Sequence, residues 1–156
     1  MNRWLIDIWK FHRTLERGGF LAALALAEAP NVFHCAVAGA PVTYWEGYDT
    51  HFTERYMGNP LENYGGYRSA SVLEHCGKMR GHLMIVHGMM DDNVHFEHSV
   101  RLCAALEKAG KVSGTDYTLM ALPNMRHMRL KDRTLISGRV SSFFEHQLAL
   151  PVSSSS

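Results

Sequence analysis

The sequence predicts an α/β fold in which parallel strands alternate with helices. One observation is the apolar run from Leu83 to Val86, which has no polar interruption, as expected of a strand covered on both faces. A second is that strand-like segments are separated by helical segments of ten or more residues, the pattern of βαβ units. With 156 residues, 46% of them hydrophobic, the chain is long enough for one domain with a buried core.

The first half contains one predicted helix, one predicted strand and an aromatic segment. GGFLAALALAEAP, residues 18–30, is rich in Ala and Leu and ends at a proline, which predicts a buried helix. VFHCAVAGAP, residues 32–41, predicts a strand with a small-residue end that allows close packing. Between Thr43 and Met57 aromatic residues recur at helical spacings of three, four and four; they are Trp45, Tyr48, Phe52 and Tyr56.

The second half adds two strands and two helices. After the strand Leu83–Val86, a helix is expected over residues 96–109, ending at Gly110. DYTLMALP, residues 116–123, predicts the third strand, and residues 135–148 predict a final amphipathic helix. The expected inward residues are Val100, Cys103, Ala104 and Leu106 in the first helix, and Val140, Phe143 and Phe144 in the second.

Residues 2–12, NRWLIDIWKFH, leave two alternatives open. A helix would align Trp4, Ile8, Phe11 and Leu15 on one side. A strand would instead pair with the apolar inner edge that a three-stranded sheet exposes.

Charge and cysteine content argue against several classes of function. The net charge is +1, and positive and negative residues are interspersed, so the sequence shows no basic patch of the kind that binds nucleic acid. The longest apolar run, Phe20–Ala27, is too short for a membrane span of about 20 residues, and the start of the chain lacks the features of a secretory signal. The three cysteines are odd in number and widely spaced, which predicts reduced thiols and a cytoplasmic location.

Ten histidines suggest a metal site as a hypothesis, but their spacing does not support one. His95 and His98 lie three residues apart, yet no second pair completes a known ligand pattern. We therefore interpret the histidines as scattered surface residues and expect neither a metal nor another cofactor.

Polar side chains follow the carboxyl ends of three predicted strands, where open parallel sheets bind their ligands. The first strand leads into Pro41-Val42-Thr43, the second into Asp91-Asp92-Asn93 and the third into Asn124-Met125-Arg126-His127. An aspartate after one strand and a histidine after the next can hydrogen-bond across the sheet, as an acyl-transfer triad requires.

Each of these residues also has a simpler interpretation. Asp91 would only cap a turn or pair with Arg126, His127 would be a surface histidine, and Asn93 would be a turn residue. The aromatic residues would be core filler, which helical aromatic stripes usually are. Taken jointly, in this order and at these strand ends, the residues favour the functional interpretation.

Three segments together resemble the catalytic domain of serine peptidases of the prolyl oligopeptidase (S9) family. They are AGAPVTYWEGYDTHFTERYMGNP (residues 38–60), HGMMDDNVHF (87–96) and LPNMRH (122–127), and they are most similar to the branch of dipeptidyl peptidases 4, 8 and 9. The resemblance extends from about residue 18 to 148 and implies the C-terminal part of an α/β-hydrolase fold. We thus expect a divergent N-terminal segment (1–17), a partial peptidase S9 catalytic domain (18–150) and a disordered serine-rich tail (151–156).

The resemblance implies a role for each site residue. Asp91 would be the triad acid, His127 the general base, and Asn93 would hold the carbonyl of the penultimate substrate residue. The slot for proline or alanine would be lined by Val42, Trp45, Tyr48, Phe52 and Val94. Phe52 stands where the family usually has tyrosine, so one hydroxyl is lost while the ring that stacks on proline is kept.

The family's nucleophilic serine lies in a Gly-x-Ser-x-Gly elbow, which here matches TLERGGF, residues 14–20. Glu16 occupies the position of the serine, and Thr14 replaces a glycine that the tight elbow requires. Ser69, Ser71 and Ser99 lie outside any elbow-like sequence. We therefore expect a truncated, inactive form of a proline-specific peptidase whose full-length parent acts on peptides. The alternative is a non-catalytic module that binds a full-length peptidase subunit or a second copy through the last helix.

Overall fold

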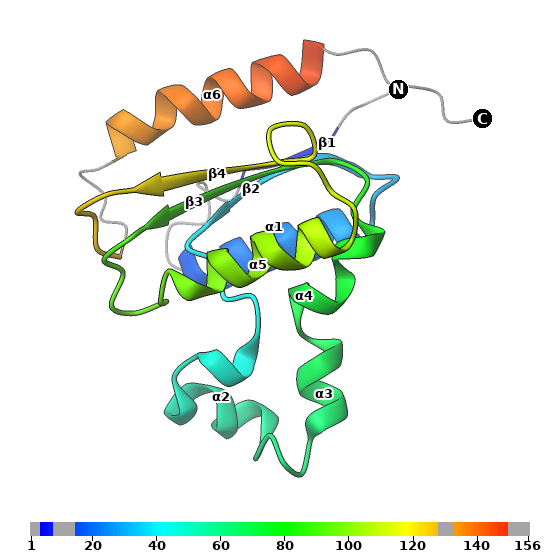
Figure 1. Cartoon of the computed structure of the whole chain (residues 1–156), viewed down its shortest axis with the longest axis vertical. Coiled ribbons are helices and arrows are strands. Elements are labelled where there is room, and N and C mark those ends of the chain that lie inside the picture. Colours follow the sequence, from blue (N-terminus) through cyan, green and yellow to red (C-terminus); the bar gives the residue numbers. More distant parts are fainter. Residues whose placement is uncertain (1–3, 8–14, 128–132, 150–156) are drawn as a thin grey trace.

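A parallel sheet forms the centre of the computed structural model, which describes residues 4–7, 15–127 and 133–149, with side chains for residues 18–127 and 136–147. Within these residues the strands are β1 (Trp4–Asp7), β2 (Phe33–Gly39), β3 (His82–Gly88) and β4 (Tyr117–Leu122), in that spatial order. Every adjacent pair is parallel. Figure 1 shows the arrowheads of β3 and β4 at the same edge of the sheet.

Strand β1 decides between the two alternatives for the start of the chain. Residues 4–7 pair with β2, with Trp4 opposite Phe33 and Ile6 opposite Ala36. The helical interpretation is thus wrong for Trp4, while Ile8 and Phe11 lie outside the described residues, as does the expected tail at 151–156. Because β1 pairs with β2, the apolar edge that three strands alone would expose is covered.

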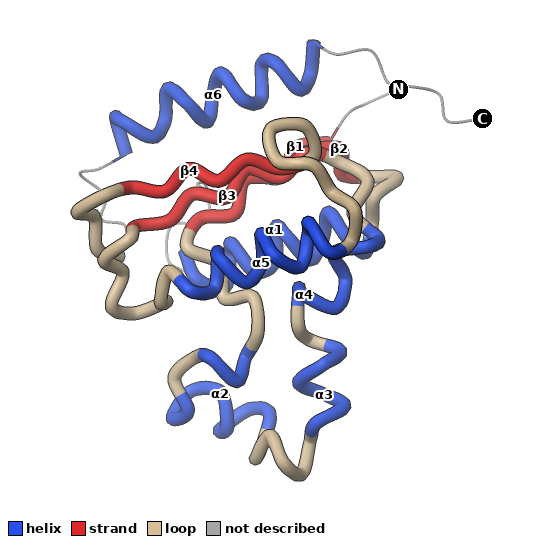
Figure 2. Tube along the Cα trace, in the orientation of Figure 1, coloured by secondary structure: helices blue, strands red, loops and turns tan. Residues whose placement is uncertain are grey.

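Helices cover both faces of the sheet, α1 (Leu15–Glu28) and α5 (Glu97–Lys108) on one and α6 (Arg133–Ala149) on the other (Figure 2). Successive side chains of a strand point to opposite faces. Leu83 and Ile85 accordingly enter the core beneath α1 and α5, whereas Met84 and Val86 enter the core beneath α6. This division explains the unbroken apolar run and confirms the predicted parallel strand.

Helix α1 packs closely on the end of β2 because Gly19 has no side chain. A Cβ atom at this position would lie 2.4 Å from the carbonyl oxygen of Gly39 and 3.0 Å from the Cα of Pro41. The sequence predicts a helix that starts after the two glycines, but α1 begins at Leu15 and includes both; it ends at Glu28, shortly before Pro30. Its buried residues include Ala22, Ala23 and Leu26, so the small side chains bring the helix near the sheet.

The buried face of α5 differs from the predicted one. Leu106 is buried as expected, but Val100 is 50% exposed and Ala104 is exposed. The buried positions are instead His98, Ser99, Leu102 and Leu106. The prediction was wrong because it ranked residues by hydrophobicity, whereas buried hydrogen bonds place a histidine and a serine inside the protein.

The continuous helix predicted between Thr43 and Met57 is interrupted. A 3-10 turn, η2 (Trp45–Gly47), precedes α2 (Thr50–Met57), and the Asp49 side chain caps α2 by accepting from the His51 N–H at 2.9 Å. The break follows from chemistry that the aromatic spacing does not reveal, since aspartate favours a helix start over a helix interior. Ring contacts persist across the break, with the Trp45 and Phe52 centroids 6.3 Å apart.

Short helices return the chain to β3: α3 (Tyr64–Ser69), α4 (Val72–His75) and η3 (Cys76–Lys78). Figure 1 shows α2 and α3 extending away from the sheet. The Tyr67 hydroxyl donates to the Gly58 carbonyl at 2.8 Å, and the Val72 N–H donates to the Thr43 carbonyl at 2.9 Å. The first bond joins α3 to the end of α2, and the second joins α4 to the segment that follows β2.

Helix α6 confirms the final amphipathic helix. Val140 and Phe144 are buried against the sheet, and Phe143 packs beside them while remaining partly exposed. Among the described helices none is long and apolar enough to cross a membrane. Cys35, Cys76 and Cys103 are free thiols, as the sequence predicts.

We expect Gly19→Ala to destabilise the fold by about 1–3 kcal/mol, because the added methyl group collides with backbone atoms that cannot move independently. Gly138→Ala is the matched control, since Gly138 also lies in a helix but a Cβ there meets nothing within 4 Å. The control should gain up to about 1 kcal/mol from helix propensity. Urea unfolding of both variants measures the difference, and equal effects would show that the close approach of α1 is wrong.

Candidate active site

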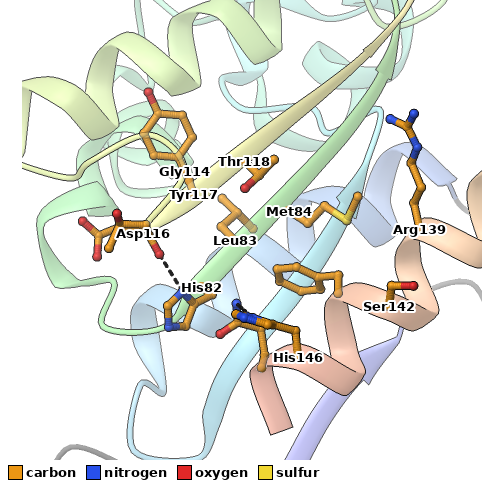
Figure 3. A pocket seen from close by; sticks show the side chains of 13 residues that line it. His82, Leu83, Met84, Gly114, Asp116, Tyr117, Thr118, Arg139, Ser142 and His146 are labelled. Carbon is orange, nitrogen blue, oxygen red and sulfur yellow. Dashed lines mark hydrogen bonds between the residues drawn. The ribbon is translucent and has the colours of Figure 1, made fainter. Parts of the chain in front are cut away.

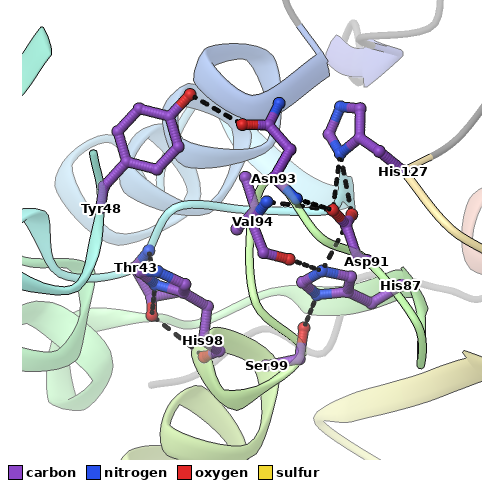
Figure 4. A network of polar contacts seen from close by, with 9 residues as sticks. All are labelled: Thr43, Tyr48, His87, Asp91, Asn93, Val94, His98, Ser99 and His127. Carbon is purple, nitrogen blue, oxygen red and sulfur yellow. Dashed lines mark hydrogen bonds and ion pairs between the residues drawn. The ribbon is translucent and has the colours of Figure 1, made fainter.

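The segments that follow β2, β3 and β4 carry the polar residues of the candidate site. The sheet register brings the strand ends together, with Gly39 opposite Val86 and Gly88 opposite Leu122. Figure 4 shows side chains from all three segments gathered at this edge. The position agrees with the prediction from the parallel sheet.

Asp91, in the turn after β3, is the centre of the site. Its side chain is fully buried, and its Oδ2 accepts a hydrogen bond from Nδ1 of His127 at 2.8 Å. The backbone N–H groups of Asn93 and Val94 both donate to Oδ1 at 3.0 Å. Asp91 therefore caps its own turn and also accepts a hydrogen bond from the imidazole across the sheet.

Arg126 does not pair with Asp91. Its guanidinium lies 3.4 Å from Oδ2 of Asp92, and both side chains are largely exposed. The neighbouring aspartates are thus divided between two partners, the buried one facing His127 and the exposed one facing Arg126. An exposed pair of this kind adds little stability.

The environment of Asp91 favours the charged carboxylate. Burial by itself raises the pKa of Asp91, but hydrogen bonds from His127, His87 and the backbone of Asn93 outweigh it and bring the pKa below its ordinary value of 3.8. A buried carboxylate with this many donors stays ionised at neutral pH. It can then orient the imidazole and stabilise its protonated form.

A second histidine lies behind the carboxylate, opposite His127 (Figure 4). His87 is fully buried, with Nε2 2.9 Å from the Val94 carbonyl and 3.4 Å from Oδ2 of Asp91. Because a carbonyl can only accept, Nε2 carries a proton, and Nδ1 accepts from the Ser99 hydroxyl at 2.7 Å. The interpretation of all histidines as surface residues is therefore wrong for His87 and for His98, both of which are fully buried.

The segment that carries His127 lies directly over Gly88. A Cβ at Gly88 would lie 2.4 Å from the carbonyl oxygen of Met125 and 2.6 Å from that of Arg126. The Met90 N–H also donates to the Met125 carbonyl at 2.9 Å, and Asn124 turns the chain with a φ of 59°, a conformation that asparagine tolerates. A glycine at the end of β3 thus lets the histidine segment come near enough for the contact with Asp91.

The aromatic residues predicted for substrate binding form one cluster beside this turn. Val42, Trp45 and Val94 are buried, and the partly exposed Tyr48 and Phe52 pack against them. The Tyr48 and Phe52 ring centroids are 6.0 Å apart at 76°. The Tyr48 hydroxyl lies 3.4 Å from Oδ1 of Asn93, so the polar end of the cluster adjoins the acid turn. All six predicted binding residues are therefore neighbours in space.

The position predicted for the nucleophile is described only in part. Residue 16 lies in the first turn of α1, but the Glu16 side chain and the whole of Thr14 lie outside what the structure describes. The three serines considered above have other partners. The Ser69 hydroxyl donates to the Gly66 carbonyl, that of Ser71 donates to the Thr43 carbonyl, and that of Ser99 donates to His87.

The described residues include no group of three or more His, Cys, Asp or Glu side chains that could hold a metal ion. Two surface cavities lie away from the candidate site. One, of about 330 Å³, lies between strands β3 and β4 and helix α6, where His82 contacts the Thr115 carbonyl at 2.7 Å (Figure 3). The other, of about 380 Å³, lies between α4 and α5.

The geometry of the site provides acid–base chemistry beside an aromatic surface. Asp91 fixes Nδ1 of His127 as the protonated ring nitrogen, so Nε2 is the atom that would exchange a proton with a substrate or nucleophile. His127 is partly exposed while Asp91 is not. A buried anion behind an accessible imidazole is the arrangement of a general base and its orienting acid.

Comparison with known proteins identifies relatives with a similar sequence. A family model described as "Prolyl oligopeptidase family" matches residues 17–150. Dipeptidyl peptidase 8 of Mus musculus is 43% identical over 113 residues, which are 70% of this chain and 12% of that protein. Venom dipeptidyl peptidase 4 of Vespa velutina is 47% identical over 96 residues, 59% of this chain and 12% of that protein. The chain thus spans only a small part of the length of these relatives.

A solved structure agrees with the sequence matches. The crystal structure of Porphyromonas gingivalis dipeptidyl peptidase 4 superposes with a TM-score of 0.77 at 29% identity, covering 85% of this chain and 18% of that one. The similarity therefore includes the sheet and its helices, not only the short motifs.

We expect Asp91→Asn to destabilise the fold at pH 7 by about 1–3 kcal/mol, since it removes a charged acceptor from a buried network. The folded pKa of Asp91 is lower than its ordinary value of 3.8. Its stabilisation is therefore present above that pH and is lost as the pH falls through the lower folded pKa. The difference between wild type and variant should shrink over the same range, as measured by urea unfolding at several pH values.

Asp92→Asn is the control, because Asp92 is exposed and pairs only across the surface. It should change stability by less than about 1 kcal/mol at any pH. An equal loss in both variants would contradict the special role of the buried carboxylate.

Proposed function

The chain belongs to the prolyl oligopeptidase family, and we propose that it supplies the acid–base pair and the binding wall of a serine-peptidase active site that cleaves after proline or alanine. Its fold is one part of the α/β-hydrolase fold that its dipeptidyl peptidase relatives contain. The observation that carries the proposal is the 2.8 Å contact between Asp91 and Nδ1 of His127.

In the proposed reaction His127 acts as the general base. Its Nε2 takes the proton from a serine hydroxyl as the oxygen attacks the substrate carbonyl, and later gives that proton to the leaving amine. Asp91 stabilises the imidazolium that forms between these steps. The donors around Asp91 hold it ionised for this task without competing for Nε2.

We propose that the aromatic cluster receives a proline or alanine side chain on the amino-terminal side of the cleaved bond. Tyr48 and Phe52 are partly exposed aromatic rings, on which the flat pyrrolidine ring of proline would stack. Asn93 lies beside them, 3.4 Å from the Tyr48 hydroxyl, where its amide would donate to a substrate carbonyl. The dipeptidyl peptidase names of the relatives support this substrate class.

We further propose that these 156 residues do not hydrolyse peptides by themselves. Glu16 stands at the serine position and Thr14 at the glycine position of the elbow. A carboxylate is a poor nucleophile towards an amide, and loss of the serine alone lowers the rate by about 10⁶-fold in subtilisin. Hydrolysis would then belong to a longer product that contains the Gly-x-Ser-x-Gly elbow.

Binding without turnover is the expected result for the purified chain. We expect no cleavage of alanyl-prolyl-p-nitroanilide, but binding of alanyl-pyrrolidide with a Kd on the order of millimolar, given the small size of the ligand. The amide signals of Tyr48, Phe52 and Asn93 should shift in ¹H–¹⁵N NMR titrations. Phe52→Ala should weaken binding at least about fivefold, because it removes the ring on which the pyrrolidine stacks.

Tyr64→Ala is the matched control, since Tyr64 is an exposed aromatic residue of α3 and should leave the Kd unchanged. Equal loss in both variants, or shifts confined to other regions, would contradict the proposed pocket. If the wild type does cleave the substrate and Glu16→Ala cleaves it equally well, the chain uses a nucleophile other than Glu16.

A second candidate is a non-catalytic module that binds a peptidase subunit through α6, and Phe143 favours it. This ring is partly exposed although it packs against buried Phe144, with centroids 5.5 Å apart, and it lines the 330 Å³ cavity. Phe143→Asp should abolish co-purification with a full-length dipeptidyl peptidase, and urea unfolding of the same variant measures the stability that its lost packing on Phe144 costs. Ser141→Asp, at an exposed position of the same helix, is the control. A monomer that binds no such subunit would exclude this candidate.

A further inference from the structure

The first turn of α5 contains a buried histidine that the proposed reaction does not use. His98 is fully buried, and its ring reaches from α5 to the segment 43–47, which follows β2 and begins the aromatic cluster. Figure 4 shows His98 beside Thr43, on the far side of the network from His127. A polar ring at this depth needs partners for both of its nitrogens.

Both ring nitrogens bind the backbone of that segment. The Thr43 N–H donates to Nδ1 at 3.1 Å, and Nε2 donates to the Gly47 carbonyl at 3.1 Å. The Thr43 hydroxyl donates to the carbonyl of His98 itself at 3.0 Å. One residue of α5 therefore fixes both ends of a five-residue segment.

The bonds require the neutral imidazole. A protonated Nδ1 would point a hydrogen at the Thr43 N–H, and two donors cannot pair. Burial, partly opposed by the bond to Gly47, lowers the pKa of His98 to about 4. The ring thus keeps one tautomer, protonated on Nε2, at neutral pH.

A stack of side chains supports the same segment from outside. The centroids of the Tyr44 and His98 rings are 4.5 Å apart, and the Arg101 guanidinium lies over the Tyr44 ring, 4.5 Å from its centroid. Gly47 folds beneath Tyr44 so closely that a Cβ there would be 2.2 Å from the ring. The segment is therefore held from several sides, with His98 as the part that bonds its backbone.

The fixed segment carries the inner wall of the aromatic cluster. Trp45 lies between the two anchored residues, and its ring contacts those of Phe20, Tyr48 and Phe52 at centroid distances of 5.1, 6.1 and 6.3 Å. Movement of the backbone at 43–47 would tilt this indole and with it the two partly exposed rings.

We propose that His98 is a positioning residue that sets the width of the pocket for a proline-sized ring by holding the backbone at Thr43 and Gly47. The inference rests on the proposed function for the identity of the ligand, but not for the effect on the segment. His98 acts through Trp45 and does not need to touch the substrate. Its neighbour Ser99 bonds His87 behind Asp91, so one helical turn supports both the pocket and the acid.

Three substitutions separate the two bonds. His98→Leu removes both. His98→Asn retains an acceptor near the position of Nδ1 for the Thr43 N–H, and His98→Gln retains a donor near the position of Nε2 for Gly47. His146→Leu is the control, because His146 is an exposed histidine of α6, on the opposite face of the sheet.

The measurements are amide hydrogen exchange at Thr43, the indole signal of Trp45 in ¹H–¹⁵N NMR, and the Kd of alanyl-pyrrolidide. In His98→Leu we expect exchange at Thr43 to rise about 100-fold, the Trp45 signal to shift, and the Kd to rise about tenfold. His98→Asn should restore most of the protection at Thr43 and part of the affinity. A merely structural role would not produce this recovery at one amide.

The proposal would be overturned if the amide of Thr43 exchanged in His98→Leu at the same rate as in the wild type. It would also be overturned if Thr43 lost protection in this variant but the Kd stayed equal to that of the wild type. If His98→Leu does not fold, His98→Asn and His98→Gln decide, because the first should protect Thr43 and the second should not. If the wild type binds no alanyl-pyrrolidide, the proposed pocket function fails, and Thr43 exchange with the Trp45 signal alone decides whether His98 positions the segment.

Discussion

A carboxylate removed from water must find hydrogen-bond donors within the protein, and this requirement organises the edge of the sheet around Asp91. The donors come from three parts of the chain: the backbone of its own turn, the end of β3 through His87, and the segment after β4 through His127. Each can reach the carboxylate only if the parallel strands end side by side. The buried charge and the sheet register therefore depend on each other, since a shift in pairing would leave an unpaired anion inside the protein.

Three histidines near this edge perform different tasks because their surroundings differ. His127 is partly exposed and hydrogen-bonded to an anion, so solvent can reach its ring while Asp91 holds the ring in place. His87 is buried between a carbonyl and a hydroxyl, and its fixed tautomer supports the back of the carboxylate. His98 is buried between two backbone groups of another segment. Residue type alone does not distinguish these roles; burial and partners do.

The sequence predicts the fold class, the strands β2, β3 and β4, and the contact between Asp91 and His127, because these depend on apolar runs, strand order and motifs that are local. It does not predict that His87 and His98 are buried, since their partners Ser99, Thr43 and Gly47 are scattered and give no periodic signal. The sequence shows that residues 19 and 88 are glycines, but not that backbone atoms far along the chain lie too close to them for a Cβ atom. The break at Asp49 was missed because a side-chain cap outweighed the aromatic spacing.

The contacts that the structure describes for Asp91 and His127 come from β3, β4 and the segments that follow them. The close contact at Gly88 brings the segment after β4 onto the end of β3. On the other side of β2 from β3, strand β1 pairs through Trp4 and Ile6, and Gly19 lets α1 approach the end of β2. A chain that keeps β1 beside β2, Gly19 in α1 and Gly88 at the end of β3 retains the sheet, the aromatic cluster and the contact between Asp91 and His127.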